Sequence, residues 1–307
     1  MPDLKLNIIT RKSPLAMWQA QHVCQNLETI YPDLTVNIAG ITTEADKFLD
    51  RSLDKFGGKG AFTKELELAL LDGTADLAVH SMKDVTVDLP DGLEICAILT
   101  RQDPGDAFLS NSYKHIDELP SGSSIGTSSL RRISQLLAYR PDLKIKAIRG
   151  NVGTRLKKLD NGEFDALILA SSGLKRMGLN DRITHEINMA IMLPAIGQGA
   201  LGLEVRSSNS DHINLLQVLN DETTFKCVMA ERRVNKKLNG GCHAPIAAYA
   251  SVSGSTMTIS AKVGSLDGSQ IIDSIVSGPV ESALELGDTA GDKLVSQGAL
   301  EILSTNI

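Results

Sequence analysis

The feature that most constrains the fold is an alternation of strand-like and helix-like stretches that runs once and then starts again. In the first pass, a strand at 6–10 leads through Ser13-Pro14 into a helix, because serine caps helices and proline suits their first position. A helix at 62–71 and strands at 35–39, 77–80 and 93–99 follow. Alternation of this kind predicts an α/β domain.

The second pass has strands at 124–126, 144–148 and 166–170, with helices up to about residue 139 and at 154–159. The wholly apolar run at 166–170 is typical of a parallel strand buried on both faces. Residues 10–15 and 126–131 are faintly similar, since each is a strand end that turns through hydroxyl residues into a helix. We therefore expect two similar α/β lobes around a cleft, with strand ends and helix starts facing a ligand.

The pattern changes after about residue 218. A helix at 225–238 precedes two alternating stretches, 256–263 and 270–276, which are joined by a turn at Asp267-Gly268. A single final helix is expected over 282–303. These elements predict a small C-terminal α+β domain, and a chain of 307 residues is long enough for more than one core.

Composition excludes several classes of protein. The net charge of −6 and the pI of about 5.6 disfavour a nucleic-acid partner, which needs a basic field. There is no signal-peptide pattern and no apolar run that could cross a bilayer, so we expect a cytoplasmic protein with no membrane partner. The four cysteines are scattered, which favours free thiols, and the six histidines show no metal-binding spacing.

Basic residues gather where expected strands end. Guanidinium groups, together with the hydroxyls and N–H groups of helix starts, make good receptors for carboxylates or phosphates. A solvated surface charge is an equal alternative for any single arginine, but the grouping favours a polyanionic ligand. The basic residues are Arg11 and Lys83 in the first lobe and Arg131, Arg132, Arg149, Arg155 and Arg176 in the second.

The segment 76–84 reads as an apolar strand that delivers His80, Ser81, Lys83 and Asp84 to its carboxyl end. Lysine beside aspartate is commonly a surface ion pair. The functional interpretation is a carboxylate at the mouth of the cleft, able to donate a proton or to stabilise a cation.

Two glycines precede Cys242 in the sequence Gly-Gly-Cys-His, which indicates a thiol presented on a loop. A buried, inert cysteine is the alternative. A hydrolase using Cys242 and His243 is disfavoured, because adjacent residues of an extended loop point in opposite directions.

The glycine-rich segment 55–60 lacks the spacing of a nucleotide-binding loop, and its Lys55 and Lys59 suit either a positively charged lid or an ordinary surface loop.

Taken together, these segments resemble the porphobilinogen deaminase family. The resemblance covers about residues 8–250 and rests on seven motifs in order: RKSPLAMWQ (11–19), GGKGAFTKELE (57–67), DLAVHSMKD (76–84), GTSSLRR (126–132), RGNVGTRLKKLDNGEFDALILA (149–170), PAIGQGALGLE (194–204) and ERRVNKKLNGGCHAPIAAYA (231–250). It implies two lobes like those of periplasmic binding proteins plus a C-terminal domain. In this chain the division would be 1–99 with 200–217, then 100–199, then 218–307.

The resemblance also implies a function: deamination of four porphobilinogen molecules and their head-to-tail joining into hydroxymethylbilane, with release of ammonia. It implies a monomer whose dipyrromethane cofactor is held by a thioether to Cys242, with Asp84 as the catalytic carboxylate. Loss of ammonia from an aminomethylpyrrole leaves a cation that a thiolate captures readily. The positions matching the family's anion-binding residues are Arg11, Ser13, Ser81, Lys83, Thr127, Ser129, Arg131, Arg132, Arg149, Arg155 and Arg176.

One alternative stays open from the residues alone, a non-catalytic two-lobed binding protein for small anions. Such a protein would not need a Gly-Gly-Cys loop in a third domain. Two departures from the family pattern stand out. Residues 42–46 lack the usual basic residue and glycine, and Thr86 stands where proline is usual.

Overall fold

The computed structural model describes residues 5–43, 63–241 and 244–305. The chain divides into two compact units, residues 1–101 with 200–225 and residues 102–199 with 226–307. The sheet of the first unit has the order β2-β1-β3-β10-β4. Its strands are β1 (Lys5–Arg11), β2 (Thr35–Ile41), β3 (Leu77–Ser81), β4 (Leu93–Ile98) and β10 (Leu201–Arg206).

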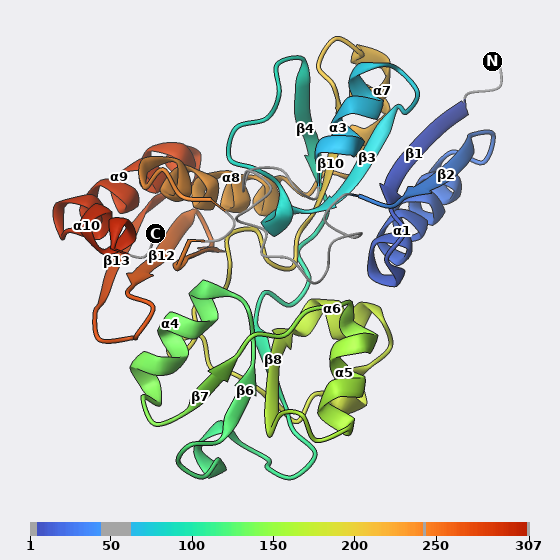
Figure 1. The fold of residues 1–307 in the computed structure, drawn as a ribbon. Coiled ribbons are helices and arrows are strands. Elements are labelled where there is room, and N and C mark those ends of the chain that lie inside the picture. The colour runs from blue at the N-terminus through green and yellow to red at the C-terminus, as the bar shows by residue number, and fades with distance from the viewer. Residues whose placement is uncertain (1–4, 44–62, 242–243, 306–307) are drawn as a thin grey trace. The chain divides into compact units, whose positions relative to one another are not determined.

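The helices of the first unit cover its sheet. Helix α1 (Pro14–Ile30) lies along one face (Figure 1), where its buried Ala20, Val23 and Leu27 pack with Leu6 and Ile8 of β1. Helix α3 (Lys64–Leu71) packs on a second cluster that includes Ala78 of β3. Among the described residues, the remaining elements of this unit are the helix α7 (Ser210–Leu216) and the short 3-10 helices η2 (Met82–Asp84) and η5 (Gln217–Leu219).

The second unit repeats the strand pairing of the first. Its larger sheet has the order β7-β6-β8-β5-β9. As β1 pairs in parallel with β2 and β3, so β6 pairs in parallel with β7 and β8. The two expected α/β lobes are therefore confirmed. The strands are β5 (Asp106–Leu109), β6 (Ser124–Gly126), β7 (Lys144–Lys146), β8 (Ala166–Ala170) and β9 (His185–Glu186), and the helices are α4 (Leu130–Tyr139), α5 (Val152–Asp160), α6 (Ser171–Arg176), η3 (Ile116–Glu118) and η4 (Asn180–Arg182).

Neither sheet is purely parallel. Strand β10 runs antiparallel between β3 and β4, and β5 runs antiparallel between β8 and β9. A run of buried apolar residues reports burial on both faces but not strand direction, so the antiparallel neighbours of β3 and β8 were not visible in the sequence.

The rest of the second unit is a small α+β region, as expected. Its antiparallel sheet contains β11 (Ile246–Ser253), β12 (Thr256–Gly264) and β13 (Ile271–Pro279) in that order. Figure 1 shows α9 and α10 beside this sheet, with which they share a core. The helices are α8 (Glu222–Lys237), α9 (Ala283–Ser296), α10 (Ala299–Ser304) and η6 (Val280–Ser282).

The expectation of one final helix over 282–303 was wrong. The chain makes two helices, α9 and α10, because Gly298 has a left-handed φ of 93° between them. Glycine takes that conformation with little steric cost, and a helix cannot continue through it. None of the helices in the described part of the chain is long and apolar enough to span a bilayer.

Several contacts join the small sheet to the second lobe, among them the two that follow. The carboxylate of Glu231 on α8 accepts hydrogen bonds from Gly197 N at 2.7 Å and from Ala250 N of β11 at 2.8 Å. The expected turn at Asp267-Gly268 connects β12 to β13 and touches the end of α4. A Cβ on Gly268 would lie 2.3 Å from the backbone nitrogen of Ala138.

Replacing Gly268 with alanine tests this contact. Gly254 is the matched control, because its φ of 60° is also left-handed but a Cβ there would meet nothing within 4 Å. We expect G254A to lower the free energy of unfolding by about 1 kcal/mol through backbone strain. We expect G268A to lower it by about 1–3 kcal/mol more, because the added methyl collides with α4. Equal losses in chemical denaturation would show that the turn does not press on α4.

Candidate functional site

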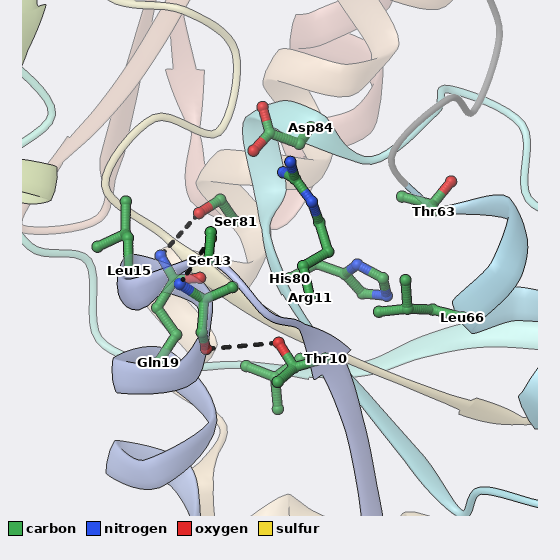
Figure 2. Close-up of a pocket in the computed structure, with 12 residues that line it drawn as sticks. Thr10, Arg11, Ser13, Leu15, Gln19, Thr63, Leu66, His80, Ser81 and Asp84 are labelled. Carbon is green, nitrogen blue, oxygen red and sulfur yellow. Dashed lines mark hydrogen bonds between the residues drawn. The ribbon is translucent and has the colours of Figure 1, made fainter. Parts of the chain in front are cut away.

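A pocket in the first unit opens where two neighbouring parallel strands end. Arg11 is the last residue of β1, and Ser81 is the last of β3. The start of α1 and the beginning of α3 complete the lining, and Figure 2 shows the side chains gathered there. Carboxyl ends of parallel strands are the usual place for a ligand in open α/β sheets. The pocket is lined by Thr10, Arg11, Ser13, Leu15, Ala16, Gln19, Thr63, Leu66, Val79, His80, Ser81 and Asp84.

Hydroxyl groups fix the start of α1 at this pocket. Ser13 is the N-cap, and its Oγ accepts a hydrogen bond from Ala16 N at 3.3 Å. The buried side chain of Gln19 donates to Ser81 Oγ at 2.8 Å and so ties α1 to the end of β3. A helix of this length presents the positive end of its dipole at Ser13, which favours an anion there.

The predicted catalytic carboxylate lies in the same pocket. Asp84 is the last residue of η2, directly after β3, and is half-buried. In Figure 2 the Arg11 side chain points toward the Asp84 carboxylate. Lys83 is half-buried beside Asp84 in the chain. The pocket thus brings together Arg11, Ser13, Ser81 and Asp84, four of the residues that the sequence singles out.

In the second unit, two of the predicted arginines surround one buried carboxylate. Asp106 of β5 is fully buried and accepts from Arg131 Nη1 at 2.7 Å and from Arg132 Nη2 at 2.7 Å. Gln198 Nε2 adds a hydrogen bond at 3.0 Å. Burial alone would raise the pKa of Asp106, but Arg131 and Arg132 outweigh it and hold that pKa well below its usual value.

Two guanidinium groups against one carboxylate leave this cluster with a net positive charge. Burial lowers the pKa of Arg131, although the nearby Asp106 opposes that shift. The Nε of Arg131 is buried and has no hydrogen-bond partner in the described chain, whereas Arg132 also donates to Ile168 O at 2.9 Å. The cluster thus retains one unused donor as well as positive charge.

The other predicted anion-binding residues of this unit lie around the starts of α4 and α5. Thr127 is buried, and its Oγ1 accepts from the backbone N of Ser129, the N-cap of α4, at 3.2 Å. Arg149 and Arg155 are half-buried. Arg155 Nε donates to Gly150 O at 2.8 Å, beside the N-cap Asn151 of α5.

Arg176 has a different environment. It is buried at the end of α6 and donates to Gln102 Oε1 at 2.7 Å and to Gly199 O at 2.8 Å. These partners lie at residues 102 and 199, where the chain enters and leaves the second lobe. Burial lowers the pKa of Arg176 to about 10, so it stays charged at neutral pH.

Cys242, Lys55 and Lys59 lie outside the described residues. The chain that leads to Cys242 is described: Asn239 takes a left-handed φ of 50° after α8. A Cβ on Gly240 would lie 2.2 Å from Asn235 Oδ1, whereas one on Gly241 would meet nothing within 4 Å. The loop is therefore packed at Gly240 and open at Gly241.

The cysteines that the structure describes are unsuited to nucleophilic chemistry. Cys24, Cys96 and Cys227 are free thiols, and Cys96 and Cys227 are buried. Burial, helped by Glu28, raises the pKa of Cys24 to about 11, and burial raises that of Cys96 to about 12. Because the thiolate is the nucleophile, neither thiol reacts readily near neutral pH.

Three residues that hold the predicted ones in place were not expected from the sequence: Gln19, Asp106 and Gln198. A glutamine inside an amphipathic helix and an aspartate at a strand start carry no signal of their partners. Within the described residues, no group of three or more histidine, cysteine or acidic side chains is arranged to hold a metal ion.

Comparison with known proteins gives two family models that match this chain. One describes the dipyrromethane cofactor binding domain of porphobilinogen deaminase and matches residues 6–214. The other describes the C-terminal domain of porphobilinogen deaminase and matches residues 225–296. A porphobilinogen deaminase from Chromobacterium violaceum is 51% identical over 300 residues, which cover 98% of this chain and 97% of that protein.

Solved structures of more distant proteins also match. A putative methionine-binding lipoprotein from Bacillus subtilis has a TM-score of 0.44 at 15% identity and covers 77% of this chain and 96% of its own. The methionine binding protein MetQ has a TM-score of 0.46 at 15% identity and covers 72% of this chain and 92% of its own.

Replacing Asp106 with asparagine tests the buried cluster. We expect D106N to lower the free energy of unfolding by about 3–5 kcal/mol, because two buried guanidinium groups lose their counter-charge. D142N is the control: Asp142 pairs with Arg140 at 2.7 Å but is partly exposed, so the loss there should be much smaller. Since its folded pKa lies below the usual 3.8, Asp106 stabilises the fold above that pH, and its contribution disappears on further acidification. Equal losses in urea unfolding for the two variants would contradict the assignment.

Proposed function

This chain belongs to the porphobilinogen deaminase family, and from that premise we propose which of its residues carry out the family's reaction. The enzyme is a hydroxymethylbilane synthase, a transferase of tetrapyrrole biosynthesis. It deaminates four porphobilinogen molecules and joins them into a linear tetrapyrrole. Its cofactor is dipyrromethane, which supplies the pyrrole end to which the substrate rings are added.

The described residues fit a cofactor and a product that carry many carboxylates. In the first unit, the capped start of α1 and the half-buried Arg11 and Lys83 offer positive potential. In the second, the buried Arg131 keeps an unpartnered Nε–H within a cluster of net positive charge. We assign anion binding to Arg11, Ser13, Ser81, Lys83, Thr127, Ser129, Arg131, Arg132, Arg149, Arg155 and Arg176.

Cys242 is the attachment point for the cofactor in this proposal. The other three thiols are poor candidates for this attachment, which supports Cys242. Cys24 and Cys96 have raised pKa values, and Cys227 is buried. The packed Gly240 and the open Gly241 also suit a loop that presents the next residue.

Asp84 is the catalytic carboxylate in this proposal, and one observation carries the assignment. The ends of β1 and β3 bring Asp84 and Arg11 to one pocket beside the start of α1. A carboxyl group there can hydrogen-bond a pyrrole N–H and stabilise the positive charge left on the substrate ring when ammonia departs. It can also pass a proton to the departing amine. Arg11 is placed to hold a substrate carboxylate next to Asp84.

The wider organisation is also part of the proposal. The first lobe is 1–99 with 200–217, the second is 100–199, and residues 218–307 form a third domain that carries the cofactor cysteine. The three separate sheets support this division, although the second and third parts form one compact unit. The lid that Lys55 and Lys59 suit stays a prediction from the sequence, since both residues lie outside the described part of the chain. The enzyme works as a cytoplasmic monomer, and its net charge of −6 suits neither nucleic acid nor an anionic membrane.

Replacing Asp84 with asparagine should remove nearly all turnover while leaving the fold and the bound cofactor intact. The amide has the same shape but cannot donate a proton or balance a cation, which costs about 10²–10⁴-fold in rate. Initial rates of porphobilinogen consumption measure the effect. Asp91, an exposed aspartate between β3 and β4, provides the control, and D91N should keep the wild-type rate. A wild-type rate from D84N would remove Asp84 from the mechanism.

Mass spectrometry tests the attachment site. Under denaturing conditions the wild-type chain should show an excess mass equal to two linked pyrrole units, mapping to the peptide that contains Cys242. The C242S variant should lack this mass, while C24S should keep it because the Cys24 thiol has a raised pKa. Under native conditions, one chain of 32.9 kDa plus the cofactor is expected for a monomer. A C242S protein with the full excess mass would place the thioether elsewhere.

A further inference from the structure

Behind the pocket of the first unit lies a buried group of three titratable side chains that the proposed reaction does not use. His80 is 6% exposed, Glu204 is fully buried, and Glu67 is 8% exposed. His80 Nε2 and Glu204 Oε2 are 2.8 Å apart. We call His80, Glu204 and Glu67 the acid–imidazole cluster.

The strand register explains why these three side chains share one face. Strands β3 and β10 pair antiparallel with His80 opposite Gly202 and Ala78 opposite Glu204, so His80 and Glu204 are diagonal neighbours. Their face of the sheet is the one covered by α3, because Leu66 and Leu70 pack with Ala78. Glu67 follows Leu66 on that helix and interacts electrostatically with both His80 and Glu204.

The cluster contains two carboxylates but only one group that can be positive. One oxygen of each, Glu67 Oε1 and Glu204 Oε1, is buried and has no hydrogen-bond partner in the described chain. Burying two negative charges with such poor solvation is costly. Burial raises the pKa of Glu67, and the nearby Glu204 adds to that rise, whereas Thr63 and His80 oppose it. A neutral Glu67 reduces the negative charge that the cluster would otherwise bury.

The other charged groups near the cluster do not neutralise its carboxylates. Arg206 of β10 is occupied by the carbonyl oxygens of Leu70 and Ala75, the latter at 2.7 Å, and by Asp76. Glu65 on α3 adds negative charge and raises the pKa of Glu67 further. The remaining charged residues on the elements around the cluster are Lys64 on α3, Lys5 and Arg11 on β1, Lys83 and Asp84 after β3, and Glu94 on β4.

We propose that His80, Glu204 and Glu67 are positioning residues that hold α3 against the end of β3 and so keep Asp84 and Arg11 in place for the reaction. Three observations connect the cluster to the pocket. His80 itself lines it, Thr63 and Leu66 of the α3 segment line it as well, and Asp84 follows His80 by one short 3-10 turn. The inference rests on the proposed role of Asp84, but the first test below does not depend on that role.

The first test measures stability against pH for the wild type, E67Q and E28Q. Glu67 has a folded pKa above its ordinary 4.5, so the wild type loses stability as pH rises from about 4.5 to that folded value, and then no further. Glutamine stays neutral at every pH and mimics the protonated acid. The Tm of E67Q minus that of the wild type should therefore increase with pH across this window and then level off. E28Q, which replaces a glutamate at an exposed site on α1, is the control for the change of side chain. A flat difference for E67Q would overturn the proposal.

The second test separates positioning from general stability by kinetics on purified, folded variants. H80Q replaces the imidazole beside Glu204 with an amide that stays neutral at every pH, and we expect kcat to fall roughly tenfold with KM changed less than about twofold. H80Q/E204Q replaces both members with neutral amides and should recover most of that kcat. A double variant as slow as H80Q, or a loss confined to KM, would overturn the positioning role. An inactive wild type would instead refute the proposed function, and the pH dependence of Tm would still stand.

Discussion

The buried carboxylate of Asp106 is the interaction on which the second lobe depends. Asp106 lies on β5 and accepts hydrogen bonds from two arginines of α4. It also accepts one from Gln198, in the segment before β10. No other arrangement in this lobe buries two guanidinium groups so completely, within the described residues. Breaking such a network costs more than its net contribution, because each remaining charge would be buried alone. The carboxylate therefore fixes where α4 begins and, with it, where Thr127 and Ser129 lie.

The two lobes share one strand-pairing pattern but differ in the charged and polar groups around their predicted anion-binding residues. In the first lobe the site is built from the capped start of α1, a hydroxyl held by Gln19, and a half-buried Arg11 and Asp84. In the second, the positive charge is mostly internal and is partly neutralised by Asp106. Residual positive charge remains there, and the buried Nε–H of Arg131 has no hydrogen-bond partner in the described chain. A common fold thus supports different site chemistry, as expected when function lies in the side chains.

Burying unpaired charge is also costly in the acid–imidazole cluster behind the pocket of the first unit. Two buried carboxylates lie next to a single imidazole there, and burial raises the pKa of Glu67. This makes the contact between α3 and β3 sensitive to protonation in a way that a purely apolar contact would not be. Helix α3 also supplies apolar packing through Leu66 and Leu70, so the charged groups add specificity of position rather than the main part of the burial.

The sequence by itself determined the family, the two α/β lobes and the residues at their strand ends, because these depend on local patterns. Strand periodicity, the Ser13-Pro14 helix start and the seven motifs are all written in contiguous residues. Only the tertiary structure decided which strands run antiparallel, since β10 joins β3 from more than a hundred residues away. It also decided that Arg131 and Arg132 meet Asp106, and that His80 faces two glutamates. Such pairings depend on the register of distant segments, and no pattern along the chain records which side chains will share a buried space.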